Sequence, residues 1–423
     1  MNERLTVAYV AHVFPRWGGG WLHNEVTGLV RAGVDLSVFS FNRPAGETLA
    51  QPGMAELAER TTYLPRGTSW SCIRSGLSTL LRSPAGFARG IAAAFRLGGR
   101  VSRLGHVMEI FYLAEAIRQR GARHVHAQHA DFVADAALAV AACLELPFSF
   151  AAHARDLYTS PGRLKLKIGA ATFVATCTSY NETYLKQMCA AAREEGVAPG
   201  KIARVYHGVD LERFSFTRGS VSPERLISVT RLKEKKGFSY LLEAMAKLKV
   251  RGRDVRLEIY GDGDQKEAIL ERIANLGIQD RVELKGAIEH HRIPGALRSA
   301  GIFVLPCVVT ADQDRDGIPN TIIEAMATGV PVISTSISGI PEAVRDGQSG
   351  LLVPERDAER LAGAIERMIA DDDLRERCAR EGRRIAESCF SIEATGRALA
   401  ALLRSGAVST EAAARTVPEP AGR

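Results

Sequence analysis

The chain has 423 residues, 46% of them apolar, which is enough for two domains of about 200 residues with separate cores. Its seven cysteines form no CxxC pair, which argues against a disulfide framework or a zinc site and for a reducing compartment. The net charge is +7 without a nucleic-acid recognition motif, so nucleic acid is not an expected partner. There is no signal peptide and no apolar run of membrane-spanning length, which predicts a cytoplasmic protein, soluble or attached to a surface.

The first half of the chain alternates between strand and helix patterns. Strands are predicted near 5–10, 34–40, 123–127, 147–151, 172–177 and 202–206. Such alternation is typical of a parallel sheet covered by helices on both faces.

Two loops of this half carry candidate site residues. Consecutive glycines after the first strand, Gly19 and Gly20 among them, would let the backbone approach a phosphate or an acceptor closely. A merely mobile loop is the alternative. His153 follows the strand near 147–151, with Asp156 close behind it. A lone histidine there is more often structural, but ligands bind at the carboxyl ends of parallel strands, which favours a functional role.

Positive charge is concentrated between Trp70 and Gly105, where there is no acidic residue. The arginines of this stretch are Arg74, Arg82, Arg89, Arg96, Arg100 and Arg103. Apolar residues lie between them, so helices here would carry a basic stripe beside an apolar one. The pattern predicts peripheral contact of residues 70–105 with an anionic membrane, at the inner face of the plasma membrane. An arginine-bearing pair of surface helices and a basic groove for the acceptor are the alternatives.

A polar break near 207–223 separates this half from a second α/β series. Strands are predicted near 226–230, 255–260, 281–285, 302–306, 331–334 and 351–353. Two similar halves predict two Rossmann-like domains. We place them at 1–208 and 209–388, followed by a helix at 389–404 and a disordered tail at 405–423.

Arg231 and Lys236 lie between the first strand of the second series and the helix that follows it. Two cations at the carboxyl end of a strand can bind a diphosphate, the arginine as a bidentate fork and the lysine as a point charge. A solvated charged turn is the alternative, and it is the preferred interpretation for Lys233 and Lys235.

The most informative stretch runs from Asp316 to Glu324. Pro319 suits a first helical position because its missing N–H would be unpaired there anyway. A helix that opens at Pro319–Asn320 presents free N–H groups and a positive dipole end to an anion. Glu324 lies little more than one turn further on and can face the same ligand. The stretch predicts a site for a phosphate and a sugar hydroxyl together; a buried turn with a surface acid is the alternative.

Two other motifs fail on spacing. The aspartates that end at Asp316 begin like a calcium loop, but the twelfth position holds Ile323 where a glutamate is needed. Gly261 and Gly263 begin like a dinucleotide fingerprint, but Lys266 replaces the third glycine. We therefore predict no bound metal and no nicotinamide cofactor.

The motifs resemble those of family-four retaining glycosyltransferases of the GT-B fold, over most of residues 5–400. The two acids at 316 and 324, followed by Ala-Met-Ala-x-Gly-x-Pro, resemble the donor-binding signature of that family. Arg231–Gly237 resembles its Arg-Leu-x-x-x-Lys-Gly pattern, and the segment around His153 resembles its Thr-Ala-His-Ala-x-Asp. Bacterial exopolysaccharide transferases, including the colanic-acid type, are the most similar. The resemblance implies two Rossmann-like parallel-sheet domains that face each other across a cleft, the first on the acceptor side and the second binding the nucleotide sugar. It also implies that the helix at 389–404 returns to the first domain.

The same resemblance implies roles for individual residues. Glu324 would hold the ribose, Arg231 and Lys236 the pyrophosphate, and His153 would approach the donor sugar. Asp316, where a glutamate is commoner, and the amides after it would address the sugar; these residues are Gly317, Ile318, Pro319, Asn320 and Thr321. His124, His126 and His129 with Asp131 could suggest a metal, but this stretch resembles the acceptor-side strand end of the family's first domain.

The resemblance implies a hexosyltransferase that moves a sugar, with retention, from a nucleotide-diphosphate sugar to a glycan or lipid-linked acceptor in bacterial polysaccharide biosynthesis. The nucleotide sugar is a substrate, and no cofactor is expected. Another GT-B enzyme, such as an epimerase or phosphorylase, and a noncatalytic nucleotide-sugar-binding protein are the alternatives.

Overall fold

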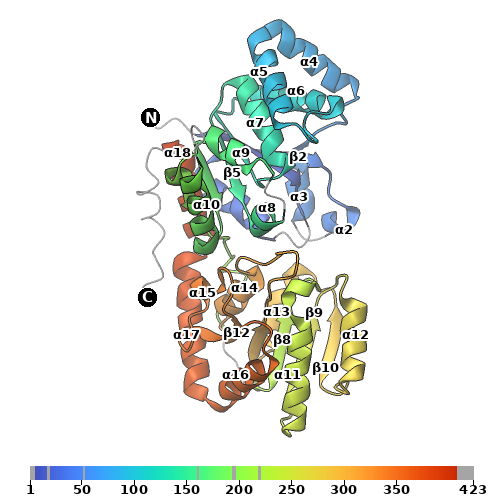
Figure 1. The fold of residues 1–423 in the computed structure, drawn as a ribbon, viewed down its shortest axis with the longest axis vertical. Helices are drawn as coiled ribbons and strands as arrows, with labels where there is room; N and C mark the ends of the chain where they lie inside the picture. Colours follow the sequence, from blue (N-terminus) through green and yellow to red (C-terminus); the bar gives the residue numbers. More distant parts are fainter. Residues whose placement is uncertain are drawn as a thin grey trace. The chain divides into compact units, whose positions relative to one another are not determined.

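The computed structural model describes residues 5–16, 20–50, 53–159, 162–192, 197–217 and 221–406. The chain divides into two compact units, which Figure 1 shows in sequence colours. Unit 1 holds the described residues up to Tyr206 and those from Glu393 onward, and unit 2 runs from His207 to Ile392. The divisions therefore fall at 206/207 and 392/393, where the sequence suggested 208/209 and 388/389. Most of the predicted tail lies outside the described residues.

Unit 1 alternates strands and helices as predicted. Its elements are β1 (Thr6–Val13), α1 (Gly20–Arg31), β2 (Asp35–Asn42), α2 (Gly46–Leu49), α3 (Met54–Glu59), β3 (Thr61–Tyr63), α4 (Trp70–Arg82), α5 (Pro84–Leu97), α6 (Leu104–Gln119), β4 (His124–Ala127), α7 (Phe132–Leu144), β5 (Phe148–Ala152), α8 (Ala154–Tyr158), α9 (Leu164–Ala170), β6 (Phe173–Thr176), α10 (Ser179–Ala191), η1 (Pro199–Lys201), β7 (Ile202–Arg204) and α18 (Ile392–Ser405). The six predicted strands are confirmed. The sequence did not predict β3, a short strand at the sheet edge without a full apolar pattern.

The sheet of unit 1 is parallel, in the order β3-β2-β1-β4-β5-β6-β7. Alternate residues of β1 point to opposite faces. Ala8 and Val10 join the main apolar cluster with helices α5, α6 and α7, whereas Tyr9 reaches Glu25 on α1. Helices therefore cover both faces of the sheet, as expected for parallel strands.

The last described helix, α18, packs on α1 within unit 1. Gly396 meets Gly28 so closely that a Cβ at position 396 would lie 2.4 Å from the carbonyl of Gly28. Arg404 donates to the Ala32 carbonyl over 2.6 Å, and Arg31 pairs with Glu393. Residues more than 350 positions apart in the sequence thus complete one core.

Unit 2 has the same alternation of strands and helices as unit 1. Its elements are β8 (Arg225–Val229), η2 (Glu234–Lys236), α11 (Phe238–Val250), β9 (Arg256–Tyr260), α12 (Lys266–Asn275), β10 (Val282–Gly286), η3 (His290–Arg292), α13 (Ile293–Arg298), β11 (Ile302–Leu305), α14 (Asn320–Thr328), β12 (Val332–Thr335), α15 (Ile340–Ala343), β13 (Gly350–Val353), α16 (Ala358–Ala370) and α17 (Asp372–Cys389). All six predicted strands are confirmed. They form a parallel sheet in the order β10-β9-β8-β11-β12-β13.

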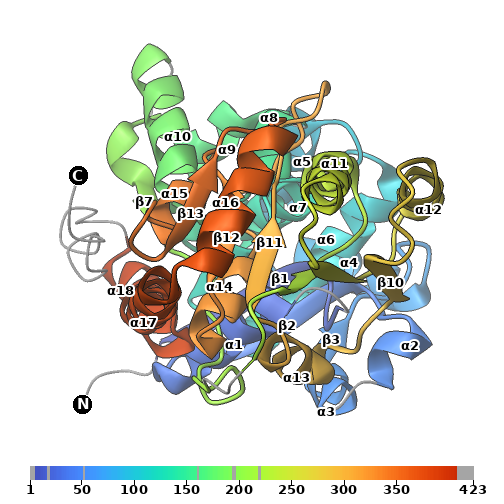
Figure 2. The ribbon, with the colours of Figure 1, turned by 90° about the horizontal axis from the view of Figure 1, so that it is seen from below.

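Figure 2 shows helices α11 and α12 on one side of this sheet and α13 and α14 on the other. Two parallel α/β units confirm the predicted fold class; that the sheets face each other across a cleft stays a prediction. Among the helices of the described ranges, none combines the length and the apolar character that crossing a membrane requires.

Candidate functional site

Both sheets reverse their strand order next to their first strand. In unit 1 the reversal lies between β1 and β4, and in unit 2 between β8 and β11. The loops at the carboxyl ends of such a strand pair separate and leave room for a ligand. Arg231 and Lys236 follow β8, and the stretch from Asp316 to Glu324 follows β11. The predicted donor residues of unit 2 therefore lie at its switch point, whereas Gly20 and His153 belong to unit 1.

The loop after β8 is held tightly against the loop after β11. Gly237 has a φ of +68°, and a Cβ there would lie 1.9 Å from the Pro306 carbonyl oxygen. Only glycine fits this approach without strain. It places the buried Lys236 beside the second loop, while Arg231 is exposed and has no ion pair with any residue that the structure describes.

Lys236 is not the free cation that its sequence context suggested. Its Nζ lies 2.6 Å from Asp316 Oδ2, and Lys235 Nζ lies 3.5 Å from Asp316 Oδ1. Burial alone would raise the pKa of Asp316, but the two lysines outweigh it and hold that pKa below its usual value. Asp316 is therefore a carboxylate, and it sets the position of Lys236. Lys235, assigned to a solvated turn from the sequence, belongs to this cluster.

Helix α14 begins at Asn320, with Pro319 as its N-cap and not its first residue. The prediction of a helix opening at Pro319–Asn320 thus differs from the structure by one position. His207 Nδ1 lies 3.3 Å from Asn320 Oδ1, and Thr321 follows in the first turn. First-turn N–H groups of a helix have no partner within the helix and attract an anion.

Glu324 is buried in α14 with one carboxylate oxygen unsatisfied. Its Oε1 lies 3.5 Å from His290 Nε2, whereas Oε2 has no hydrogen-bond partner among the described residues. A buried oxygen without a partner is unfavourable by about 1–3 kcal/mol, which a hydroxyl donor from a ligand would relieve. A ribose hydroxyl would be such a donor, and the contact between it and Glu324 stays a prediction. The sequence analysis did not single out His290. Its position just after the strand β10, at the carboxyl edge of the sheet, could have indicated a site residue.

In unit 1, the loops after β4 and β5 bring two histidines and an aspartate together. His129 Nδ1 lies 3.2 Å from Asp156 Oδ2 and 3.0 Å from His153 Nδ1. Trp21, on the helix that Gly20 opens, has its ring centroid 4.7 Å from that of His153. Gly19 lies outside the described residues. These ligating atoms lie within 4.8 Å of one another, a composition that could hold a metal; that the protein works without a metal stays a prediction.

The charges of this cluster determine which ring nitrogen of His153 carries the proton. Burial lowers the pKa of His153 despite Asp156, so its ring is neutral. Burial also acts on His129, but the hydrogen bond and charge of Asp156 outweigh it and raise the pKa of His129. His129 Nδ1–H therefore donates, and His153 Nδ1 accepts. Neutral His153 then carries its proton on Nε2 and is a hydrogen-bond donor.

Replacing His153 with glutamine should preserve more activity than replacing it with asparagine. The glutamine amide nitrogen takes the place of Nε2, whereas that of asparagine takes the place of Nδ1. We expect about a tenfold loss of kcat/KM for His153→Gln and about 100-fold or more for His153→Asn. Imidazole nitrogen-15 shifts of the wild type provide a check that needs no activity. A His153 ring protonated on Nδ1, or an asparagine variant better than the glutamine variant, contradicts the assignment.

Glu25 on α1 lies next to this cluster and accepts a 2.5 Å hydrogen bond from Tyr9. Burial raises the pKa of Glu25 to about 7, and the Tyr9 hydrogen bond offsets only part of that rise. The sequence analysis did not single out Glu25, because its burial depends on α1 packing over β1.

Stability should fall as pH rises from about 4.5 to about 7, because folded Glu25 keeps a proton that the unfolded chain releases in that window. Glu25→Gln cannot ionise, and its amide oxygen can still accept from Tyr9. Above pH 7 the variant should be more stable than the wild type by about 3 kcal/mol. Below the ordinary pKa of 4.5 the two proteins should unfold alike. Urea unfolding across this pH range measures the difference in the free energy of unfolding between the two proteins. A difference that does not change with pH would disprove the prediction.

His124 and His126 share a face of β4, as predicted, and both lie against Ser149. Burial lowers the pKa of His124 to about 4 and that of His126 to about 3, so both rings are neutral. His129 belongs instead to the Asp156 cluster. The histidines of this stretch thus separate into a buried structural pair and one member of the candidate site.

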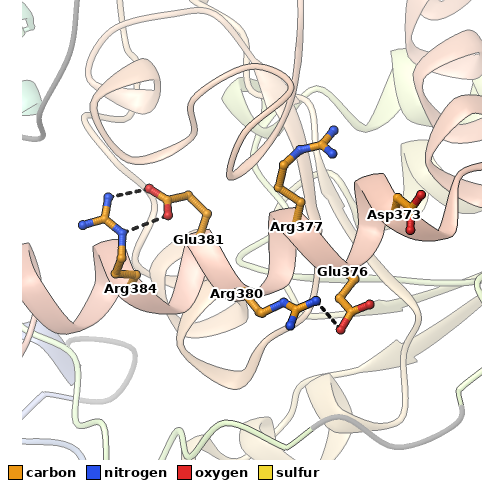
Figure 3. A pocket seen from close by; sticks show the side chains of 6 residues that line it. All are labelled: Asp373, Glu376, Arg377, Arg380, Glu381 and Arg384. Carbon is orange, nitrogen blue, oxygen red and sulfur yellow. Dashed lines mark hydrogen bonds and ion pairs between the residues drawn. The ribbon is translucent and has the colours of Figure 1, made fainter.

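A surface hollow of about 400 Å³ lies along α17, away from these residues in the sequence. Figure 3 shows two of its three arginines in ion pairs, Arg380 with Glu376 and Arg384 with Glu381. The third, Arg377, donates to the Gly347 carbonyl. Its lining includes none of the predicted site residues, so we assign it no ligand.

Comparison with known proteins agrees with this geometry. Residues 212–385 match the family described as Glycosyl transferases group 1. A putative colanic acid biosynthesis glycosyltransferase, WcaL of Salmonella typhimurium, is 38% identical over 214 residues, 50% of this chain and 52% of WcaL. The amylovoran biosynthesis glycosyltransferase AmsK of Erwinia amylovora is 38% identical over 175 residues, 41% of this chain and 43% of AmsK. The chain spans about half the length of the curated relatives it matches.

The solved structures extend the likeness to both units. HepE from Anabaena, crystallised with UDP and glucose, has a TM-score of 0.71 at 16% identity, covering 95% of this chain and 100% of HepE. Sucrose-phosphate synthase from Thermosynechococcus elongatus has a TM-score of 0.67 at 18% identity, covering 95% and 99%. At such identities the likeness shows the fold alone, which is GT-B.

The class is therefore a two-unit α/β protein of the GT-B fold. More specifically, residues 212–385 match the Glycosyl transferases group 1 family, which agrees with the resemblance predicted from the sequence over this range.

Proposed function

We propose that the protein is a retaining glycosyltransferase that takes a hexosyl group from a nucleotide-diphosphate sugar. The observation that carries this proposal is the switch point of unit 2, where Arg231 and Lys236 follow β8, Lys236 contacts Asp316 before α14, and Glu324 has a buried oxygen without a partner among the described residues. Cations and helix N–H groups suit a diphosphate, and a buried carboxylate suits a ribose diol. HepE, which shares the fold, was crystallised with UDP and glucose.

In the proposed reaction, the protein stabilises charge on the departing diphosphate. Arg231, Lys236 and the amides from Gly317 to Thr321 would supply fixed positive potential as the glycosidic bond breaks. Asp316 would hold Lys236 in place and contact the sugar, and the Nε2–H of His153 would donate to a sugar oxygen. We assign no protein nucleophile. Retention would follow from attack on the face that the diphosphate leaves, with a phosphate oxygen taking the acceptor proton.

The acceptor in this proposal is a glycan or a lipid-linked saccharide of bacterial polysaccharide biosynthesis. Matches to colanic acid and amylovoran biosynthesis proteins support that class. We further propose a cytoplasmic protein in peripheral contact with the inner face of the plasma membrane through residues 70–105, because a lipid-linked acceptor would be found there.

A panel of nucleotide sugars tests the donor assignment. A true donor should raise the melting temperature of the purified full chain, since a ligand at 100 times its Kd adds about 2.7 kcal/mol of stability. Nucleotide release that depends on an added acceptor, with transfer of the sugar, would support the transferase. Nucleotide or sugar phosphate formed without a glycan acceptor would indicate an epimerase or phosphorylase instead, and binding without turnover a nucleotide-sugar-binding protein.

A further inference from the structure

Helix α4 presents its large apolar side chains to solvent and buries its small ones. The buried residues are Cys72, Ser75, Gly76 and Thr79. The exposed apolar residues are Trp70, Ile73, Leu77, Leu80 and Leu81. Trp70 is 75% exposed and Leu81 is 77% exposed, values unusual for such residues in a soluble protein. A surface helix normally turns its apolar stripe toward the core.

The small residues explain how α4 is held in this orientation. At 100° per residue, the five exposed apolar positions fall within an arc of about 100°, opposite the buried positions. Gly76 faces α6 closely, since a Cβ there would lie 3.5 Å from Met108 Sδ. Ser69 caps the helix by accepting from the Cys72 N–H. In Figure 1, α4 lies with α5 and α6 at the outer edge of unit 1.

Exposed positive charge lies on α4 and on the elements packed against it or next to them in the chain. Exposed arginines stand on α4, on α5 and just before α6, at Arg74, Arg96 and Arg103, and none of them pairs with an acid among the described residues. Arg82, at the end of α4, pairs with Glu115. Two neighbouring apolar residues, Phe95 and Leu104, are also exposed. The stretch between Trp70 and Gly105 contains no acidic side chain.

We propose that the apolar face of α4 inserts among the headgroups of an anionic lipid bilayer. The helix would lie in the membrane plane, with these exposed arginines on lipid phosphates. A second copy of the chain is a poorer partner, because a two-fold contact brings each surface against its own equivalent and would set these arginines against one another. The proposal gives the suggested membrane contact a defined surface. It rests on α4 and the exposed arginines of residues 70–105 and not on the donor site of unit 2, so either proposal can fail while the other holds.

Vesicle flotation of the full chain tests this without any activity measurement. The wild type should float with phosphatidylcholine vesicles that contain phosphatidylglycerol. The double variant Leu77→Ser/Leu81→Ser should bind at least about tenfold more weakly, since two buried leucine side chains are lost from the lipid phase. Arg74→Gln/Arg96→Gln should lower binding about 30-fold at low salt, since each arginine contributes about 1 kcal/mol near such a surface. Vesicles of phosphatidylcholine alone should bind the wild type far less.

Matched controls lie elsewhere on the chain. Val250 on α11 is 87% exposed, and Arg397 on α18 is exposed, so Val250→Ser and Arg397→Gln should float like the wild type. Insertion should also shift the tryptophan emission to the blue, and Trp70→Phe should remove that shift. Lack of flotation on anionic vesicles overturns the proposal. So does a wild-type dimer, detected by sedimentation, that the leucine variant abolishes, because the face would then be a protein interface.

Discussion

Arg231→Ala is expected to lower kcat/KM at least tenfold and to leave the melting temperature unchanged. Arg231 is exposed and has no ion pair among the described residues, so the folded state loses little when the side chain is removed. A charge-assisted contact to the diphosphate contributes about 1.5–3 kcal/mol, which sets the size of the kinetic loss. Steady-state kinetics with the donor identified by thermal shift, alongside calorimetry, measures both.

Two further variants serve as comparisons for Arg231→Ala. Lys233 lies two residues away and pairs with Asp264 at the surface, so Lys233→Ala should keep wild-type kinetics. Lys236→Ala should lose activity too, but it should also melt earlier, because Asp316 would keep its charge without its closest partner. Arg231→Ala with wild-type kcat/KM would show that the diphosphate does not bind at this loop.

Glu324→Gln should weaken donor binding about 10- to 100-fold without destabilising the protein. The wild-type carboxylate has a buried oxygen that meets no donor, so removing its charge should leave the ligand-free melting temperature unchanged or raise it. Two hydroxyls of a ribose that donate to a carboxylate would each lose part of a charge-assisted bond. Donor titration by calorimetry and thermal shift without ligand measure the two effects separately.

Ligands without the ribose diol give the control for Glu324. A 2′,3′-dideoxy nucleotide should bind the wild type and Glu324→Gln with similar affinity, because neither protein can use the missing hydroxyls. Equal loss of affinity for the deoxy and the ordinary nucleotide in the variant would place Glu324 elsewhere on the ligand. A large fall in the ligand-free melting temperature would show that the carboxylate is structural.

The strand ends could be predicted from the sequence because short apolar runs mark most of the buried parallel strands. Once β8 and β11 are placed, Arg231, Lys236 and Glu324 must follow them at the carboxyl edge, and the structure places them there. The short edge strand β3 lacked that apolar run and was not predicted.

Partners across the site could not be predicted in this way. The pairing of Lys236 with Asp316 joins positions 80 residues apart, and it depends on the close approach of Gly237 to the Pro306 carbonyl. The contact of His290 with Glu324 and the Tyr9–Glu25 hydrogen bond likewise arise from packing between elements. Helical spacing reveals that α4 is amphipathic, but it does not tell which side faces the core.

Within the described residues the chain passes between the units twice, at 206/207 and at 392/393. Near these points the Val209 N–H donates to the Phe390 carbonyl over 2.6 Å, and the Ile392 N–H donates to the Val209 carbonyl. Among the described residues, unit 2 is one continuous segment, but unit 1 is made of two segments and cannot be cut free as one piece. A fragment that stops at Tyr206 would expose the glycine surface of α1 that α18 normally covers. To produce unit 1 by itself, α18 must therefore be fused to the amino-terminal fragment. For the same reason, a carboxyl-terminal deletion that removes α18 would destabilise unit 1.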